Sequence, residues 1–326
     1  MQRKTFLASL LASLLLASAG TAIAQTKLRL SHAGPDTSSQ HVAALEFAKL
    51  VKERSKGQLL ITVYAASQLG NDATVIGAVR GGTIDMMMAG SVNFAGLAPR
   101  IGVLDLPFLF SGPAHAYKVL DGATGASLMK DLDAHNLKGL AWFEVGFRCI
   151  TTKNRPVRTP ADVKGLKIRT TPNPSHILAF KLLGANPVPM PLGELFQALE
   201  SGAVDAQEHP ISITWSAKFY EVQKHLTMTR HAYTAMPLVM NKAKFDALAP
   251  ELQKVLVESA VQAASMQREL NAKDETKIIA ELRNNGMAVI ETYDAAPFRK
   301  IVGDETRKAF TEKNGGELLV AIDGAM

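Results

Sequence analysis

Two short segments, Gly82-Thr83-Ile84-Asp85 and Gly202-Ala203-Val204-Asp205, decide the fold. Each begins with a glycine and continues with an apolar residue and an aspartate that lead into an expected strand. Helix patterns precede both segments, over residues 72–80 in the first half and 192–199 in the second. This shared order of helix, glycine and strand indicates a weak internal repeat, and hence two similar α/β lobes.

The residues around the two segments alternate between strand and helix patterns. In the first half we expect strands over 27–32, 59–63 and 84–88, and a helix over 38–56. In the second half, Thr159 offers an N-cap, Pro160 a first helical position and Asp162 a third. A strand ending at Arg169 and a helix over 175–183 follow. This order predicts βαβ units with parallel strands.

Two long elements are expected to tie the halves together. The strand pattern over 140–152 exceeds the usual five or six residues, and simple alternation places Trp142, Glu144, Gly146 and Arg148 on one face. Residues 251–283 favour a helix without internal glycine or proline. At about 1.5 Å per residue this helix reaches roughly 50 Å, too far for one lobe.

Arg169 ends the apolar segment Gly165-Leu166-Lys167-Ile168-Arg169. Leu166 and Ile168 take one face of the strand, so Arg169 points to the other. A guanidinium in such a place needs an anion, and its planar donors fit a carboxylate bidentately. The anion is either a structural Asp or Glu, which is the common case, or a ligand.

The N-terminus has the pattern of a secretory signal peptide. Arg3 and Lys4 precede an apolar stretch over 6–16, and Ala22-Ile23-Ala24 offers a cleavage site. We expect cleavage after Ala24, a soluble periplasmic protein and no insertion into the membrane. The formal net charge of +6 is dispersed without a basic block, so nucleic-acid binding is not expected. Cys149 is the only cysteine, which excludes a disulfide within the chain.

Sequence signatures of catalysis are missing. The chain has no Gly-x-Ser-x-Gly elbow, no phosphate-binding glycine loop, no Gly-x-Gly-x-x-Gly and no His-Glu-x-x-His. Its eight histidines lack the spacing of metal ligands. We therefore expect no enzyme, no metal and no cofactor. An exported bilobal protein of this kind is most simply a receptor with its solute in the cleft.

Several segments, in their order and spacing, resemble the substrate-binding proteins of tripartite ATP-independent periplasmic (TRAP) transporters, the DctP-type family. The resemblance covers essentially the whole mature chain. It implies an α/β, two-lobed periplasmic-binding-protein fold, class II-like, with hinge strands and a long bracing helix. The lobes would comprise 25–145 with about 235–265, and 146–234 with about 266–326. The matching segments are 67–72, 80–85, 106–110, 165–169, 205–210 and 218–224, together with Arg148.

The same resemblance assigns roles to the two arginines. Arg169 matches the selectivity arginine that forms a salt bridge with the ligand carboxylate in relatives. Arg148 matches a second arginine that often reaches the same carboxylate. The alternative for Arg148 is an internal ion pair, for example with Glu144.

The chain has Gln207-Glu208-His209-Pro210 where many members carry Gln-Glu-Asn-Pro. His209 therefore replaces an asparagine that often bonds the ligand; it either donates to the ligand, which we favour, or fixes the turn. Glu208 either bonds ligand hydroxyls or holds an arginine in place, and we favour the second role.

Further positions fall where relatives place ligand contacts. Asp72 is alternatively a helix cap and Asn173 a turn residue. Leu192 and Met236 are equally suited to the core, and Trp215 and Tyr233 either wall the cleft or fill a hinge. The remaining candidates are His32 at the end of the first strand and Asn93.

These polar residues hint at the ligand. One or two arginines call for a carboxylate, whereas His32, Asp72, Asn93, Glu144 and Asn173 suit hydroxyls. The chain also resembles the branch with the diketogulonate receptor and several hexuronate receptors. We therefore expect a sugar acid: glucuronate, galacturonate or a keto-gulonate. The alternatives are a C4-dicarboxylate such as succinate or malate, a periplasmic enzyme acting on sugar acids, and a sensory module detached from transport.

The mechanism that the family implies is capture, closure and delivery. The ligand, a small organic acid, would stabilise a closed form through its contacts with both lobes. The closed receptor would then dock onto the small and large membrane permease subunits. We expect it to act as a monomer.

Overall fold

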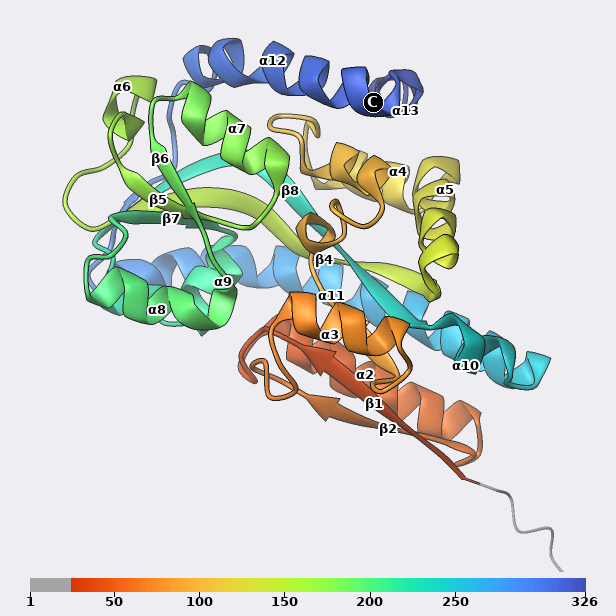
Figure 1. Ribbon diagram of the computed structural model, residues 1–326. Helices are drawn as coiled ribbons and strands as arrows, with labels where there is room; N and C mark the ends of the chain where they lie inside the picture. The colour runs from red at the N-terminus through yellow and green to blue at the C-terminus, as the bar shows by residue number, and fades with distance from the viewer. Residues whose placement is uncertain (1–24) are drawn as a thin grey trace, which may run out of the picture.

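Within residues 25–326, the part of the chain that this computed structural model describes, nine strands form one continuous mixed sheet (Figure 1). The predicted signal peptide, residues 1–24, lies outside the described residues. The strands are β1 (Thr26–His32), β2 (Leu59–Tyr64), β3 (Met86–Met88), β4 (Leu137–Thr152), β5 (Lys167–Thr170), β6 (Asn186–Pro189), β7 (Ala206–His209), β8 (His225–Asn241) and β9 (Ala288–Ile290). Their order is β2-β1-β3-β8-β4-β7-β5-β6, with β9 beside β8.

The helices follow the predicted alternation with the strands. Asn71 caps α3, and Thr159 with Asp162 forms the predicted capping box of α6. The α-helices are α2 (Ser39–Arg54), α3 (Asp72–Arg80), α4 (Pro113–Leu120), α5 (Ala123–Asp131), α6 (Pro160–Val163), α7 (Pro174–Leu182), α8 (Leu192–Glu200), α9 (Ile211–Ser216), α10 (Lys242–Asp246), α11 (Pro250–Asn284), α12 (Ala296–Asn314) and α13 (Glu317–Asp323). Short 3₁₀ helices include η1 (Ser91–Asn93) and η2 (Pro99–Asp105).

The internal repeat is visible in the topology. The units β1-α2-β2-α3-β3 and β5-α7-β6-α8-β7 give the same strand orders, β2-β1-β3 and β6-β5-β7. The two repeated aspartates also do the same work: Asp85 accepts a hydrogen bond from the backbone N–H of Arg29 at 2.7 Å, and Asp205 accepts one from that of Lys167 at 2.9 Å. Each carboxylate thus fixes a strand to its parallel neighbour.

β4 and β8 join the two halves. β8 pairs with β3 through residues 238–240 and with β9 through 225–227, while β4 pairs with β7 through 149–152. Gly146 lies opposite Thr234, and Glu144 opposite Ala235. The expected lobe boundaries at 145/146 and 234/235 therefore face each other across the two strands.

The prediction that Glu144 and Arg148 share one face of β4 is wrong, because the strand contains a β-bulge. The pairing with β8 shifts between Glu144 and Gly146, so Val145 is an extra residue, and Gly146 has a φ of +114°. Because a bulge interrupts the two-residue period, Glu144 and Arg148 point to opposite sides of the sheet. Glu144 lies against Tyr117 and Tyr233, whereas Arg148 lines a cavity on the other side.

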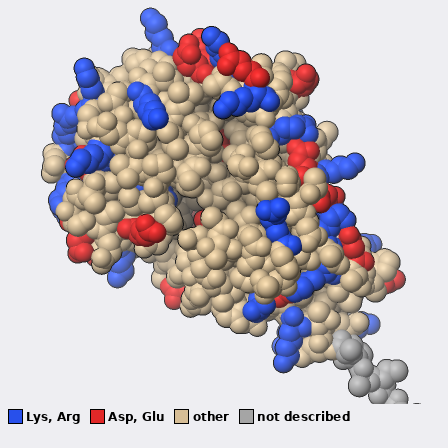
Figure 2. All heavy atoms as spheres, viewed as in Figure 1, with Lys and Arg blue, Asp and Glu red and all other residues tan. Residues whose placement is uncertain are grey.

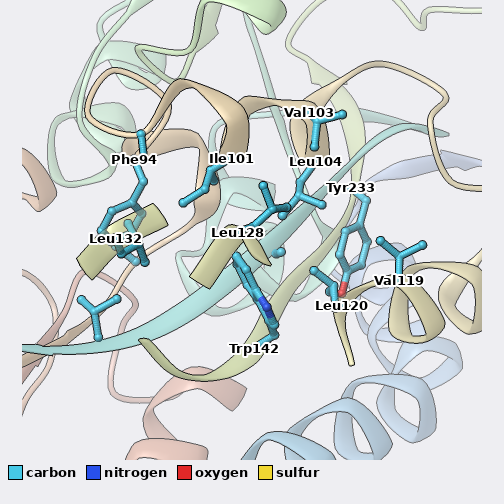
Figure 3. Packing of buried hydrophobic residues seen from close by; sticks show 14 of the residues in the cluster. Phe94, Ile101, Val103, Leu104, Val119, Leu120, Leu128, Leu132, Trp142 and Tyr233 are labelled. Atoms are coloured by element: carbon cyan, nitrogen blue, oxygen red, sulfur yellow. The ribbon is translucent and has the colours of Figure 1, made fainter. Parts of the chain in front are cut away.

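The largest apolar core lies in the first half of the molecule, and Figure 3 shows part of it. Trp142 of β4 and Leu128 of α5 pack there with Phe94 and Leu104. Phe310 of α12 and the α13 side chains join this core, so the assignment of all of 266–326 to the second lobe does not describe their packing. Phe298 of α12 does pack in the second half, beside Ile168 and Phe180.

α11 runs across both halves, close to the extent predicted (Figure 1). Ala260 and Ala263 pack on the first half, against Phe47 of α2 and Leu28 of β1. Further along the helix, Ile279 and Leu282 pack on the second half, against β8 and β9. One helix therefore packs on both halves of the molecule, as its length indicates.

Candidate ligand site

A cavity of about 100 Å³ lies where the two halves and the crossing strands meet. It collects the carboxyl ends of β1, β3, β5 and β7, the edge at which α/β sheets bind ligands. The first half lines it mainly with small or neutral groups. The lining residues are Ala33, Gly34, Gln40, Asn71, Asp72, Ala73, Met88, Ala89, Gly90, Val92 and Asn93; Val145, Arg148, Thr234 and Met236; and Arg169, Thr171, Pro172, Pro191, Leu192, His209 and Ile213.

Arg169 reaches this cavity from the end of β5 and is only 2% exposed. Its Nε and Nη2 both donate to the Met190 carbonyl, at 3.0 and 2.6 Å, and its Nη1 lies 3.2 Å from Nε2 of His209. Within residues 25–326, no carboxylate forms an ion pair with it. Of the five guanidinium N–H groups, three are therefore held by protein, and one on each terminal nitrogen is left.

Burial lowers the pKa of Arg169 but leaves the side chain charged at neutral pH. Burial and the like charge of Arg148 lower the pKa of Arg169 to about 9, against the opposing influence of Glu208 and Asp72. The guanidinium is thus charged at neutral pH, and it is held in place by neutral acceptors alone. Arg169 therefore offers a planar anion two parallel N–H donors and a full positive charge.

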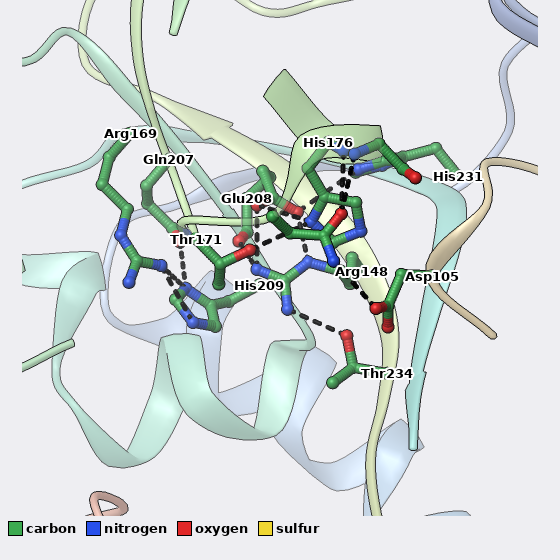
Figure 4. Close-up of polar contacts among 12 residues, drawn as sticks. Asp105, Arg148, Arg169, Thr171, His176, Gln207, Glu208, His209, His231 and Thr234 are labelled. Carbon is green, nitrogen blue, oxygen red and sulfur yellow. Dashed lines mark hydrogen bonds and ion pairs between the residues drawn. The ribbon is translucent and has the colours of Figure 1, made fainter. Parts of the chain in front are cut away.

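Arg148 has a different environment, which Figure 4 shows. Its Nε and Nη2 donate to the Glu208 carboxylate, Nη2 also reaches the Glu208 carbonyl at 2.6 Å, and Nη1 donates to Thr234 at 3.1 Å. Both charged side chains are at most 1% exposed. Glu208 thus holds Arg148 in place, and the internal ion pair of Arg148 is with Glu208, not with Glu144.

The electrostatics of Glu208 follow from this pairing. Burial alone would raise its pKa, but Arg148, together with His176 and His231, holds the pKa of Glu208 well below its usual range. Glu208 and Arg148 therefore cancel as charges. Only one guanidinium N–H of Arg148 is left for a ligand.

His209 lies between Arg169 and Gln207. Its Nδ1 is 2.8 Å from Oε1 of Gln207, and its Nε2 is the nearer ring nitrogen to Nη1 of Arg169, at 3.2 Å compared with 3.5 Å for Nδ1. Burial, with Arg148 and Arg169 nearby, holds the pKa of His209 well below its usual range. Both ring nitrogens have protein partners, so His209 has no free N–H for the predicted hydrogen bond to a ligand.

Asp72 and Asn93 face the cavity from the first half. The Asn93 amide donates to the Asp72 carboxylate at 3.1 Å. Asn71, not Asp72, provides the side-chain cap of α3. Burial raises the pKa of Asp72 to about 6, although Arg169 and Asn93 oppose the shift. Asp72 thus presents a mostly ionised acceptor at neutral pH.

Five predicted site residues do not line the cavity, because each is engaged elsewhere; one of them, Glu208, is the partner of Arg148. Asn173 caps α7 and donates to Asp105 at 2.9 Å, and His32 contacts His41 at 3.1 Å. The Glu144 carboxylate accepts from Tyr117, Tyr233 and Asn271, and Trp215 stacks on Tyr220 at 5.0 Å.

The sequence reasoning missed a buried polar cluster behind the arginines. Asp105 accepts from Ser91 at 2.6 Å as well as from Asn173 of the other half, and burial raises the pKa of Asp105 to about 7. His176 lies 3.8 Å from Glu208, and burial lowers the pKa of His176 to about 3. Asn173 and Glu208 are distant in sequence from their partners Asp105 and His176, so no local sequence pattern predicts the cluster.

Comparison with known proteins decides the family. The DctP model, described as bacterial extracellular solute-binding protein, family 7, matches residues 30–313. The chain belongs to the DctP family. Members of the DctP family are periplasmic solute receptors of TRAP transporters, and this chain is one of those receptors.

Three relatives of this DctP-family receptor have known ligands. The 2,3-diketo-L-gulonate-binding periplasmic protein of Escherichia coli is 48% identical over 305 residues, which are 93% of each chain. A TRAP solute-binding protein from Polaromonas bound to D-erythronate is 36% identical, with a TM-score of 0.89 over 91% of this chain and 98% of that one. The Advenella mimigardefordensis sugar acid binding protein in complex with galactonate is 32% identical, with a TM-score of 0.88 over 93% and 99%.

Two further findings concern the described part of the DctP-family chain. Among residues 25–326, no helix has the length and hydropathy needed to cross a membrane, and no three His, Cys, Asp or Glu side chains are grouped to hold a metal ion. Figure 2 shows basic and acidic side chains dispersed over the face it displays.

Proposed function

We propose that this receptor captures a sugar acid, such as glucuronate, galacturonate or a keto-gulonate. One observation carries the proposal: Arg169 is a buried, charged guanidinium without a carboxylate partner among residues 25–326, and it lines a cavity between the halves. Two of its N–H groups match the two oxygens of a ligand carboxylate. The diketogulonate, erythronate and galactonate ligands of relatives support the same class.

The charges around the cavity favour one carboxylate over two. Glu208 already compensates Arg148, which leaves Arg169 as the single uncompensated cation, and Asp72 adds a negative charge on the opposite wall. A second ligand carboxylate near Asp72 would lie close to a like charge. Hydroxyl groups instead donate to Asp72 and find the Asn93 amide beside it. A C4-dicarboxylate such as succinate or malate fits this arrangement less well.

Closure would follow from binding across the two halves. A ligand that contacts Arg169 on one side and Asp72 on the other favours the conformation that brings both walls together. The lobes would divide at 145/146, at the bulge of β4, and at 234/235, opposite it on β8. The closed receptor would deliver the ligand to the small and large permease subunits as a monomer in the periplasm, after cleavage behind Ala24.

A thermal-shift screen of the mature protein tests the ligand class. The screen compares uronates, galactonate and 2,3-diketo-L-gulonate with succinate and malate. A ligand at a hundredfold excess over its Kd raises stability by about 2.7 kcal/mol. A shift with sugar acids alone supports the proposal, whereas a shift with succinate or malate alone refutes it.

The function from another class, a periplasmic enzyme that alters sugar acids, predicts a different result. A receptor returns its ligand unchanged, so the proton NMR spectrum of a sugar acid should be identical before and after long incubation with the protein. New signals that depend on the protein would support the enzyme.

A further inference from the structure

The neighbouring strands β4, β7 and β5 place Thr151, Gln207 and Arg169 side by side at the buried end of the site. In the sheet register, Gln207 of β7 lies opposite Thr151 of β4 on one side and Arg169 of β5 on the other. His209 follows two residues later on β7 and faces Arg169. Gln223 contacts Thr151 from the segment before β8. Thr151, Gln207 and Gln223 are all fully buried.

The hydrogen bonds among these residues run in one direction. The Gln207 amide donates to Oγ1 of Thr151 at 2.8 Å, and the Thr151 hydroxyl donates to Oε1 of Gln223 at 3.1 Å. The Gln207 carbonyl oxygen is thereby turned toward His209, whose Nδ1 lies 2.8 Å away. An amide oxygen only accepts, so this Nδ1 carries the proton.

The other end of the chain requires the same arrangement. A guanidinium only donates, so Nε2 of His209, 3.2 Å from Nη1 of Arg169, accepts with its lone pair. The imidazole is thus neutral and protonated at Nδ1 alone. In the opposite tautomer or the imidazolium, an N–H at Nε2 would face the N–H of Arg169 (Figure 4).

We propose that Thr151, Gln207 and Gln223 are positioning residues that fix the Nδ1-protonated tautomer of His209 and, through it, the orientation of Arg169 toward the ligand carboxylate. The inference rests on the proposed role of Arg169 in binding a sugar acid. None of the three residues lines the cavity, so they act on the ligand only through His209 and Arg169. The low pKa that burial gives His209 supports the neutral ring.

The test compares three variants with the wild-type mature protein. Thr151→Val removes the hydroxyl but keeps the shape, and Thr151→Ser keeps the hydroxyl. Thr152→Val is the matched control: Thr152 is also buried on β4, but its hydroxyl donates to the Arg155 carbonyl, outside the chain to Arg169. Long-range ¹H–¹⁵N spectra of the ligand-free proteins report the tautomer of His209, and calorimetric titration with D-glucuronate and 2,3-diketo-L-gulonate reports affinity.

The wild type should show a protonated Nδ1 and a bare Nε2 at neutral pH, and Thr151→Ser and Thr152→Val should keep that pattern and bind within about twofold of wild type. Thr151→Val should shift the His209 signals toward a mixture of tautomers and weaken binding roughly tenfold, the loss expected when one hydrogen bond between Arg169 and the ligand carboxylate is misaligned. A wild-type His209 protonated at Nε2 overturns the proposal. So does a Thr151→Val variant that matches Thr152→Val in both spectrum and affinity. The tautomer is read without ligand, so its result tests the positioning role even if the protein binds neither of these two sugar acids, which would count against the proposed function alone.

Discussion

Glu208→Gln tests the role of the buried carboxylate in holding Arg148. The pair is fully buried, and the carboxylate accepts from two nitrogens of the guanidinium. The substitution preserves size but leaves Arg148 charged and uncompensated where its side chain is only 1% exposed. Breaking a buried ion pair from one side typically costs about 3–5 kcal/mol. For a chain of this length the melting temperature should fall by roughly 6–15 °C.

Urea unfolding followed by circular dichroism measures this loss, with Glu200→Gln on the exposed end of α8 as the control that changes the same charge. The double variant Glu208→Gln, Arg148→Met should recover much of the loss, because removing both members of a buried pair is often nearly neutral. Ligand should also stabilise the single variant more than it stabilises the wild type, because its carboxylate supplies part of the missing charge.

The reasoning fails if Glu208→Gln unfolds within about 1 kcal/mol of wild type. It fails equally if the double variant is less stable than the single one, because Arg148 would then be held by contacts other than the charge of Glu208.

The remaining predictions concern Arg169, Asp72 and Asp105. Arg169→Met should lose about 3–6 kcal/mol of sugar-acid binding, roughly 10²- to 10⁴-fold in Kd by titration calorimetry, because two charged hydrogen bonds disappear, while the ligand-free protein melts nearly as before; a large loss of apo stability would indicate a structural role instead. Asp72→Asn should weaken D-glucuronate binding and improve the relative binding of succinate, and an unchanged ratio of the two Kd values would contradict the charge argument. Burial raises the pKa of Asp105 from 3.8 to about 7, so its contribution to stability is full below pH 4 and is lost as the pH rises to 7, up to roughly 4 kcal/mol; the free energy of unfolding of Asp105→Asn relative to wild type should therefore rise between pH 4 and 8, and a difference that does not change with pH would refute the shift.

Much of the fold follows from local sequence. Alternating apolar residues and glycine stops fixed most strands and helices of the repeat to within a few residues, and α3 over 72–80 has the predicted bounds. The face on which Arg169 lies follows from sequence because a four-residue strand obeys a strict two-residue period, with Ile168 in the core and Arg169 opposite. Local periodicity is sufficient where no bulge or distant partner intervenes.

The failures share a physical cause. Alternation placed Glu144 beside Arg148, but the bulge at Val145 depends on how β4 pairs with β8, about ninety residues away. The family resemblance suggests Asn173 as a ligand contact, but its side chain donates to Asp105, which lies 68 residues earlier in the chain. Such polar residues satisfy their hydrogen bonds through tertiary contacts, and a single sequence does not contain that information.

The internal repeat also accounts for how a ligand should lie in the cavity. The two βαβαβ units bring the carboxyl ends of equivalent strands to opposite walls, with β1 and β3 on one side and β5 and β7 on the other. The framework aspartates Asp85 and Asp205 are alike in both units, whereas the residues that follow the strands differ: the second unit supplies the cation Arg169, and the first supplies Asp72 and Asn93. A near-symmetric scaffold with one cationic wall orients a ligand that has a carboxylate at one end and hydroxyls at the other. We therefore expect the carboxylate to point toward β5 and the hydroxyls toward α3, an orientation in which a second carboxylate would meet Asp72 instead of a cation.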